Sequence, residues 1–410
     1  MYEWSEQAKQ IRSMVRRFIE AEIAPRIDEF EHEGVPPYDV LRKMVKTFGL
    51  GEMAKAQFRK QIEREKGEAE KKPARSEKSI EERQNEIAMR LLPIIELCRY
   101  SPGMVTALGV SMGLTANAIL SKGTIRQKQK YALPLLTLEK VGAWAITEPG
   151  SGSDAFGSMK STARRDPDGE GYVLSGSKTF ITNGPYADTI VFICKLDEGN
   201  EPKDRKVLSF ILEKGTKGLD QSRPLRKMGL HSSPTGELFL DDVRVGKEQL
   251  IGESEEAAGG RGGAKSTFTA ERTGVAAMAL GMVERCLELC TDYARTRVQF
   301  GKPIGDFQLI QLKLAKMEVA RANIQNMVFR QIELAAAGKQ LSLAEASACK
   351  LYSAQAAMDV CLEAVQLFGG NGYMSEFRVE QLCRDAKVLQ IYGGTDEIQI
   401  THIARDLLAE

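Results

Sequence analysis

The chain has 410 residues and a mass of 45.3 kDa, which predicts two or three packed subdomains rather than one core. Its 57 Lys and Arg balance 56 Asp and Glu, so a net charge of +1 argues against nucleic acid or an anionic membrane as a partner. The 7 cysteines form no Cys-x-x-Cys pair and the 3 histidines lie far apart, so we expect neither a disulfide framework nor a metal site. No apolar signal core opens the chain and no run of about 18 apolar residues stands out, so we expect no membrane span and a reducing, cytoplasmic location.

The first part of the chain has mostly helical periodicity. Residues 5–50 carry apolar side chains on one stripe, with breaks at Pro25 and at residues 34–37, and Ser5 followed by Glu6 is typical of a helix start. Residues 54–86 are instead dominated by Lys, Arg and Glu of both signs. This pattern predicts a charged, solvent-exposed helical insertion, with a docking arm for a partner as the alternative.

Residues 87–121 return to a helical pattern with one face made small by Gly103, Gly109 and Gly113. Such a face either packs closely against a neighbouring helix or leaves room for a ligand. The sequence leaves both interpretations open.

Residues 142–245 change to the alternating pattern of strands. The strands are predicted at residues 171–174, 178–182, 189–195, 207–213 and 237–240, with 243–245 continuing the last. The first two would form a hairpin around a turn at 175–177. Short strands separated by turns predict a small β-barrel or sandwich.

A glycine-rich loop, WAITEPGSGSD at residues 144–154, precedes these strands. Its glycines allow the backbone to approach a flat or charged ligand, and its hydroxyls and amides can donate hydrogen bonds. With Thr182 and Asn183 at the end of the hairpin, two polar rims would face one site. The alternative is an ordinary glycine-rich connection.

Residues 259–266, GGRGGAKS, nearly spell a nucleotide-binding P-loop. We reject that interpretation because Ala264 replaces the glycine that must precede the lysine. The preceding residues 251–258 are also acidic, whereas a P-loop follows a buried strand.

From residue 267 onward apolar residues recur at helical spacing, and glycine-containing breaks separate four long helices. These helices are predicted at residues 268–297, 307–337, 343–368 and 379–408. Antiparallel helices with short connections form a bundle. Cys286 and Cys290, one turn apart, are expected to be small core residues rather than a disulfide or metal pair.

Several blocks taken together resemble the acyl-CoA dehydrogenase family. TEPGSGSD followed by SGSKTFITNG resembles the middle-domain signature of that family, and RTRVQFGKPI, QLFGGNG and IYGGTDE resemble three C-terminal elements. The resemblance implies an FAD enzyme that oxidises acyl-CoA thioesters to trans-2-enoyl-CoA. One departure is that residues 51–86 lack the short apolar segment and Tyr-Gly-Gly turn usual in the family.

The resemblance and the residue patterns together predict an α+β multidomain fold. Residues 1–141 would form an N-terminal α-helical domain with the charged insertion at about 54–86. Residues 142–255 would form the middle β domain, a small β-barrel or sandwich, and residues 256–410 the C-terminal four-helix bundle.

A second departure concerns the catalytic base. Many members carry a catalytic glutamate in I-Y-E-G-T, where this chain has Gly393. The position used by isovaleryl-CoA and long-chain acyl-CoA dehydrogenases, just before an arginine on the first helix of the bundle, is Glu271. The resemblance therefore implies that Glu271 is the base and that the backbone N–H of Gly393 stabilises the enolate oxygen. The alternative for Glu271 is a surface carboxylate in an N-terminal helical turn.

The resemblance also implies the ligand contacts. Substrate would contact Ser153, Tyr392 and Gly393. FAD, the expected cofactor, would contact Ile146, Thr147, Gly152, Ser153, Phe180, Thr182, Arg272, Arg297, Phe300, Ile304, Gln308, Gln366, Gly370, Thr395 and Glu397.

Members of the family share an FAD site between subunits, so a homotetramer is expected, with electron transfer flavoprotein as the electron acceptor and fatty-acid β-oxidation as the setting. The small face around Gly103 favours a medium, long or branched acyl chain. Two alternatives stay open, a related flavin-dependent oxidase and a catalytically silent acyl-CoA-binding paralogue.

Overall fold

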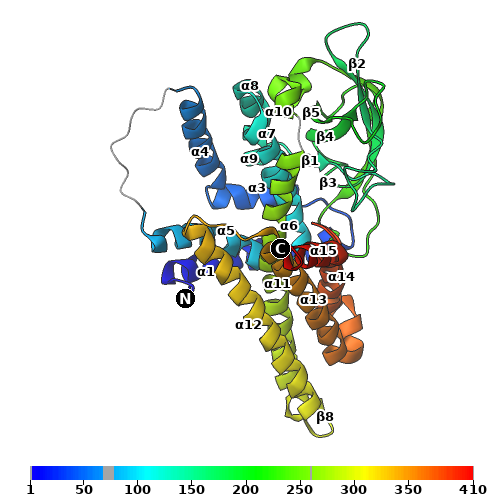
Figure 1. Cartoon of the computed structure of the whole chain (residues 1–410). Helices are drawn as coiled ribbons and strands as arrows, with labels where there is room; N and C mark the ends of the chain where they lie inside the picture. The colour runs from blue at the N-terminus through cyan, green and yellow to red at the C-terminus, as the bar shows by residue number, and fades with distance from the viewer. Residues whose placement is uncertain (1, 68–77, 259–260, 410) are drawn as a thin grey trace.

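The computed structural model describes residues 2–67, 78–258 and 261–409, with the backbone alone at 261–271 and 273. The β domain lies at the upper right of the molecule, next to N-terminal helices, and the C-terminal helices extend below it (Figure 1). The N-terminal helices are α1 (Glu6–Glu22), α2 (Ile27–Glu31), α3 (Tyr38–Thr47), α4 (Leu50–Glu65), α5 (Ile80–Cys98), α6 (Pro102–Leu108), the π-helical η2 (Gly109–Thr115), α7 (Ala116–Lys122), α8 (Ile125–Gln127), the π-helical η3 (Lys128–Ala132) and α9 (Leu133–Leu136).

Local sequence explains where the N-terminal helices begin. The Ser5 hydroxyl accepts a hydrogen bond from the N–H of Ala8 and caps α1 as predicted. Ser79 and Glu82 form a reciprocal capping box at the start of α5. The charged segment is helical at residues 54–65 and 80–86, and residues 68–77 lie outside the described part of the chain.

The stretch Pro102–Lys122 corrects one expectation. By length and composition alone it is a helix apolar enough to cross a membrane. The criterion is weak evidence, because the core helices of soluble proteins also meet it.

The small face on this stretch divides into two parts. A Cβ at Gly103 would come within 2.3 Å of the Ser232 hydroxyl oxygen, so this glycine allows close packing against the β domain. Gly109 and Gly113, both in η2, have nothing within 4 Å of the same position. Close packing therefore explains Gly103, whereas Gly109 and Gly113 leave open space.

The middle of the chain forms a mixed sheet of seven strands in the order β1-β4-β2-β3-β7-β6, and β5 also pairs with β4. β1 pairs with the first half of β4 and β2 with its end, while β5 pairs along most of its length. Its strands are β1 (Gly142–Ala145), β2 (Thr162–Arg165), β3 (Tyr172–Thr182), β4 (Thr189–Leu196), β5 (Val207–Glu213), β6 (Leu219–Gln221) and β7 (Thr235–Val245), followed by α10 (Glu255–Ala258). Every residue of β4 is buried. This strand forms the centre of the domain because β1 and β2 both pair parallel to it.

The predicted hairpin at residues 171–182 is wrong. Residues 172–182 form one strand, β3, which pairs antiparallel with β7 through two register shifts. Gly176 lies in the first irregularity with φ +148°, and a Cβ there would come within 2.3 Å of the Ser161 hydroxyl oxygen. The Ser-Gly-Ser sequence therefore forms a bulge within a strand and not a turn between two.

The C-terminal part is a helical bundle. Its elements are α11 (Arg261–Thr296), β8 (Val298–Gln299), β9 (Lys302–Pro303), α12 (Gln308–Ala336), α13 (Leu343–Phe368), α14 (Val379–Lys387) and α15 (Asp396–Leu407). Cys286 and Cys290 are fully buried and not disulfide-bonded, as predicted.

The fourth predicted helix is wrong because it is broken. Residues 391–395 separate α15 from α14 and the short helix η9 (Val388–Gln390). Gly393 and Gly394 adopt φ of +63° and +92°, which lies outside helical geometry. The break places a loop where the motif IYGGT occurs.

Candidate functional site

The loop at residues 147–154 is held by a buried ion pair. The Lys178 ammonium lies 2.8 Å from the Glu148 carboxylate and also donates to the Ile146 carbonyl oxygen. The other donors to Glu148 are the backbone N–H groups of Lys160 and Ser161, at 2.6 and 3.0 Å. These contacts fix the base of the loop, while Gly152 and Ser153 at its tip are exposed.

The electrostatics of this pair follow from its burial. Burial acts to raise the pKa of Glu148, but the Lys178 ammonium and the N–H donors outweigh it, so that pKa lies below its usual range. Burial lowers the pKa of Lys178, and Glu148 opposes that shift. The carboxylate is therefore held as an anion inside the loop.

Phe180 has an unusual backbone conformation. It lies in the second irregularity of β3 with φ +56°, and 69% of its surface is exposed. The N–H of the preceding Thr179 donates to the Thr147 carbonyl oxygen at 2.9 Å, which joins the bulge to the loop. An exposed aromatic residue at positive φ is strained, and this makes Phe180 a candidate binding residue. The structure therefore brings Ile146, Thr147 and Phe180 into one region.

Asn183 does not form the second polar rim that we expected. It is fully buried, donates to the carbonyl oxygens of Ala107 and Gly142, and accepts a hydrogen bond from the Tyr38 hydroxyl. Its role is to join the β domain to the N-terminal helices. Thr182, just before it, is half-buried.

The loop at residues 391–395 contacts the first helix of the bundle. The buried Arg272 guanidinium lies with Nε 3.5 Å from the Gly393 carbonyl oxygen. Gln399 donates to the carbonyl oxygens of Gly393 and Gly394 at 3.2 and 2.8 Å. Thr395 caps α15 through its hydroxyl, and Glu397 is exposed in the first turn of that helix.

Glu271 precedes Arg272 on α11, and its side chain lies outside the described residues. The helix begins at Arg261, so Glu271 stands ten residues inside it and not in an N-terminal turn. The alternative of an acidic residue favoured by the helix terminus is therefore wrong. Tyr392, in the same loop, also contacts α11, with its hydroxyl 3.3 Å from the Met278 sulfur.

The remaining predicted cofactor residues lie apart from this region. The hairpin of β8 and β9 is at the opposite end of the bundle from the β domain (Figure 1). It presents Phe300, which is 93% exposed at φ +53°, next to exposed Arg297. Gln308, Gln366 and Gly370 are also exposed, whereas Ile304 is buried. A single chain therefore does not bring all predicted FAD residues together.

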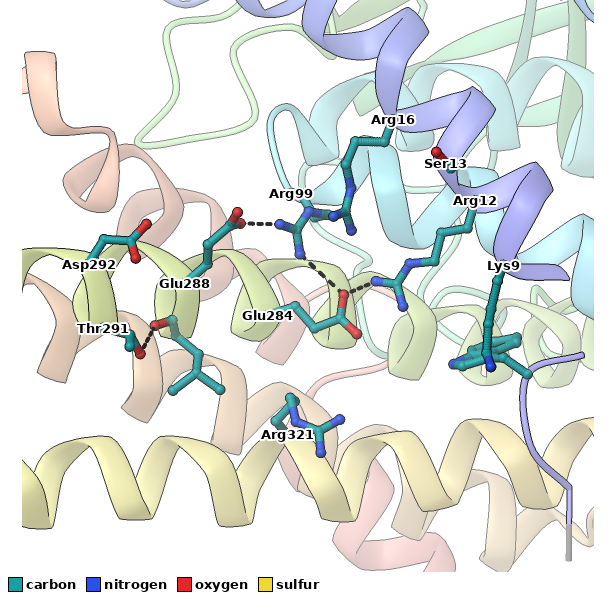
Figure 2. Close-up of a pocket in the computed structure, with 12 residues that line it drawn as sticks. Lys9, Arg12, Ser13, Arg16, Arg99, Glu284, Glu288, Thr291, Asp292 and Arg321 are labelled. Carbon is teal, nitrogen blue, oxygen red and sulfur yellow. Dashed lines mark hydrogen bonds and ion pairs between the residues drawn. The ribbon is translucent and has the colours of Figure 1, made fainter. Parts of the chain in front are cut away.

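A hollow of about 620 Å³ lies elsewhere, between α1, α5, α11 and α12, and is lined by charged residues (Figure 2). Arg12 and Arg99 both contact Glu284, and Arg99 also reaches Glu288. Beneath them Glu96 is fully buried and accepts from Arg12 and Arg16. The arginines are paired with carboxylates from neighbouring helices, so these ion pairs connect α1, α5 and α11. None of the predicted site residues lines this hollow.

A third cluster joins all three parts of the chain. His231 contacts the Glu31 carbonyl oxygen at 2.7 Å and lies 3.4 Å from its carboxylate. The Asp385 carboxylate accepts from the N–H of Leu230. Burial and the neighbouring Asp385 raise the pKa of Glu31 to about 8, against the opposing effect of Arg384. Sequence reasoning missed this cluster because its members are spread over more than 350 residues.

The chain is similar to known proteins along most of its length. The chain matches the N-terminal, middle and C-terminal domains of acyl-CoA dehydrogenases over residues 5–57, 143–243 and 258–408. It is 40% identical over 312 residues to a short-chain-specific acyl-CoA dehydrogenase of Megasphaera elsdenii, covering 76% of this chain and 79% of the relative. It is 33% identical over 408 residues to the subunit CarC of the caffeyl-CoA reductase-Etf complex of Acetobacterium woodii, covering 99% of each.

Among solved structures, the acyl-CoA dehydrogenase of Geobacillus kaustophilus superposes with a TM-score of 0.84 at 33% identity, covering 99% of each chain. The chain therefore belongs to the acyl-CoA dehydrogenase family. It is an oxidoreductase of the class that carries out flavin-dependent acyl-CoA dehydrogenation, and its fold is that of the family, helical at both ends around a mixed sheet.

Proposed function

We propose that the protein uses FAD to convert an acyl-CoA thioester to its trans-2-enoyl-CoA, with Glu271 as the base. The observation that carries the assignment is the contact of Arg272 with Gly393, which brings the helical residue after Glu271 to the IYGGT loop. A carboxylate near a backbone N–H suits removal of a weakly acidic α-proton whose charge moves onto the thioester oxygen.

The described residues fit FAD in two respects. Phe180 offers an exposed aromatic face held at positive φ beside the Thr147 loop, where a flat ring system would be covered. Gly370 is exposed with nothing within 4 Å of its Cβ position, which leaves its backbone open to a phosphate group. Bound FAD would supply the two-electron acceptor for the β-hydrogen.

The roles of the protein groups follow from their positions. Glu271 would accept the α-proton, and the Gly393 N–H would donate to the thioester oxygen as it gains charge. The residues Ile146, Thr147, Gly152, Ser153 and Thr182 would orient the flavin ring, and Tyr392 and Ser153 would contact the acyl-CoA.

We further propose a homo-oligomer in which the β8–β9 hairpin of one copy completes the FAD site of another. Support comes from the exposed apolar side chains at that end of the bundle, with Phe300 93%, Tyr373 79% and Leu309 75% exposed. Arg297, Gln308 and Gln366 would then contact FAD in the neighbouring copy. A homotetramer is the assembly we expect.

Electron transfer flavoprotein is the proposed electron partner, because the CarC relative is named as part of a complex with Etf. The same relative is named as a subunit of a reductase complex, so the direction of the reaction is part of the test. A cytoplasmic location and a role in β-oxidation also remain proposals.

The deciding experiment is the visible spectrum of the purified, FAD-loaded protein during anaerobic addition of acyl-CoAs from butyryl to palmitoyl, with isovaleryl included. We expect bleaching of the flavin in wild type and loss of bleaching in Glu271→Gln. The matched control is Glu256→Gln, an exposed carboxylate of α10. Wild-type protein that no acyl-CoA bleaches would favour the silent binding paralogue.

Two further measurements separate the alternatives. Rapid reoxidation of the bleached protein by air would indicate an oxidase. Faster reaction of the reduced protein with enoyl-CoA than of the oxidised protein with acyl-CoA would indicate a reductase.

The proposed acyl selectivity rests on the N-terminal helices. The open space beside Gly109 and Gly113 favours a medium, long or branched chain, whereas the Megasphaera relative is named as short-chain specific. Faster bleaching by butyryl-CoA than by every longer or branched acyl-CoA would contradict our expectation.

A further inference from the structure

A buried lysine on a neighbouring helix contacts the start of α15, directly after the IYGGT loop. Lys350 is near the start of α13, and its side chain is 0% exposed. Its ammonium lies 3.2 Å from the carboxylate of Asp396, the first residue of α15, and Gln355 donates to the other oxygen at 3.3 Å. A charge this deeply buried must be held by its partners, because its desolvation is costly.

The start of α15 also carries Gln399, whose side chain holds the loop. Gln399, one turn after Asp396, is fully buried and donates to both glycine carbonyl oxygens. A Cβ at Gly394 would come within 2.7 Å of the Gln399 amide nitrogen, so the loop backbone lies directly against that side chain. With both carbonyl groups fixed, the orientation of the Gly393 peptide unit is restricted.

Two cations lie near each other behind this loop. Burial lowers the pKa of Lys350, Asp396 opposes that shift, and Arg272 adds to it. Across the described residues no hydrogen-bond acceptor is found for the Gly393 N–H. A backbone donor left available at the end of a fixed loop is suited to a ligand oxygen.

We propose that Lys350 and Gln399 are positioning residues that orient the Gly393 N–H toward the thioester oxygen. The inference rests on the proposed function for the identity of that oxygen. Lys350 acts through Asp396, which anchors the first turn of α15, and Gln399 acts on the loop directly. Neither side chain is required to touch substrate or cofactor.

The test uses Lys350→Met and Gln399→Leu, which remove the donors while keeping side-chain length or volume. The matched control is Lys128→Met, because Lys128 is also a buried lysine paired with a carboxylate, Glu65, in the N-terminal part. Gln399→Leu leaves no charge unpaired, so it remains informative if Lys350→Met does not fold.

The first readout is amide hydrogen exchange of the peptide spanning residues 391–399 in the FAD-free protein. We expect about tenfold faster exchange in both variants and unchanged exchange in the control. Equal exchange in wild type and in folded Gln399→Leu would overturn the proposal.

The second readout is the exchange of acyl-CoA α-hydrogens with deuterated solvent on FAD-loaded protein, beside kcat and KM. We expect kcat and α-exchange to fall together by about tenfold to a hundredfold, with KM changed less than about threefold. Loss of FAD affinity alone, with α-exchange unchanged on saturated protein, would contradict a positioning role. Wild type that reacts with no acyl-CoA would count against the proposed function, and amide exchange would still decide whether these residues fix the loop.

Discussion

The two loops that carry the predicted site, at residues 147–154 and 391–395, are each supported by a buried lysine and carboxylate, but in different ways. Glu148 belongs to its loop and receives Lys178 and two backbone N–H groups directly. Asp396 instead follows its loop, and Gln399 holds the loop backbone. The first loop is therefore held through one of its own carboxylates, whereas the second is held by side chains that follow it in sequence.

The largest effect on stability is expected from breaking the Lys178–Glu148 ion pair at the loop of residues 147–154. Lys178→Met leaves the Glu148 carboxylate buried without its cation and should lower the free energy of unfolding by about 3–5 kcal/mol. Denaturant unfolding measures this change. The double variant Lys178→Met/Glu148→Gln, which removes both charges, should recover more than half of it. A single variant within about 1 kcal/mol of wild type would mean that the two loops do not differ in this way.

The buried carboxylate of Glu31 should make stability depend on pH in the direction opposite to that of Glu148. The pKa of Glu31 is raised to about 8, so the folded state binds this proton more tightly than the unfolded state does. This contribution to stability is complete below the ordinary pKa of the carboxyl and is lost as pH rises toward and through 8. The groups facing Glu31 are Asp385, Arg384, Lys227 and His231.

We therefore expect the unfolding temperature to fall more steeply in wild type than in Glu31→Gln as the pH rises from 4.5 to about 8. Glu148→Gln should not flatten the same profile, because the pKa of Glu148 is lowered. Parallel profiles for wild type and Glu31→Gln would contradict the assignment of this dependence to Glu31.

The smallest effect on stability is expected at the exposed face of the first loop. Phe180→Ala should change the free energy of unfolding by less than about 0.5 kcal/mol, because 69% of the side chain is exposed. FAD affinity, measured by fluorescence titration of FAD-free protein, should fall about threefold to tenfold through loss of aromatic contact. Phe239→Ala, an exposed phenylalanine on β7, serves as the control and should leave FAD affinity unchanged.

Alternation and glycine position predicted much of this fold. The strand at residues 207–213 has the predicted bounds, and the strand at 189–196 extends one residue further than predicted. The four-residue strands β1 and β2 were missed because they are too short to show a pattern and are defined by pairing with β4. The Ser-Gly-Ser bulge was read as a turn because both use glycine at positive φ.

The buried ion pairs that support the site could not be predicted from the sequence. Glu148 and Lys178 both lie in recognised motifs, yet nothing in one sequence indicates that they pair across 30 residues. Lys350 left a weak signal, since it is the one charged residue in the otherwise small and apolar run ASACKLYSA. A lone lysine on the buried face of a helix indicates a buried partner, and the identity of Asp396 required the tertiary structure.

The continuity of β3 has a mechanical consequence. Asn183, bonded to Tyr38 and to the Ala107 carbonyl oxygen, anchors the C-terminal end of this strand to the N-terminal helices. Phe180 lies three residues earlier on the same strand. Because packed interiors deform little, we expect a displacement of α3 to move Asn183 and with it the end of β3 that carries Phe180. The position of Phe180 is therefore expected to depend on a helix more than 130 residues earlier in the sequence.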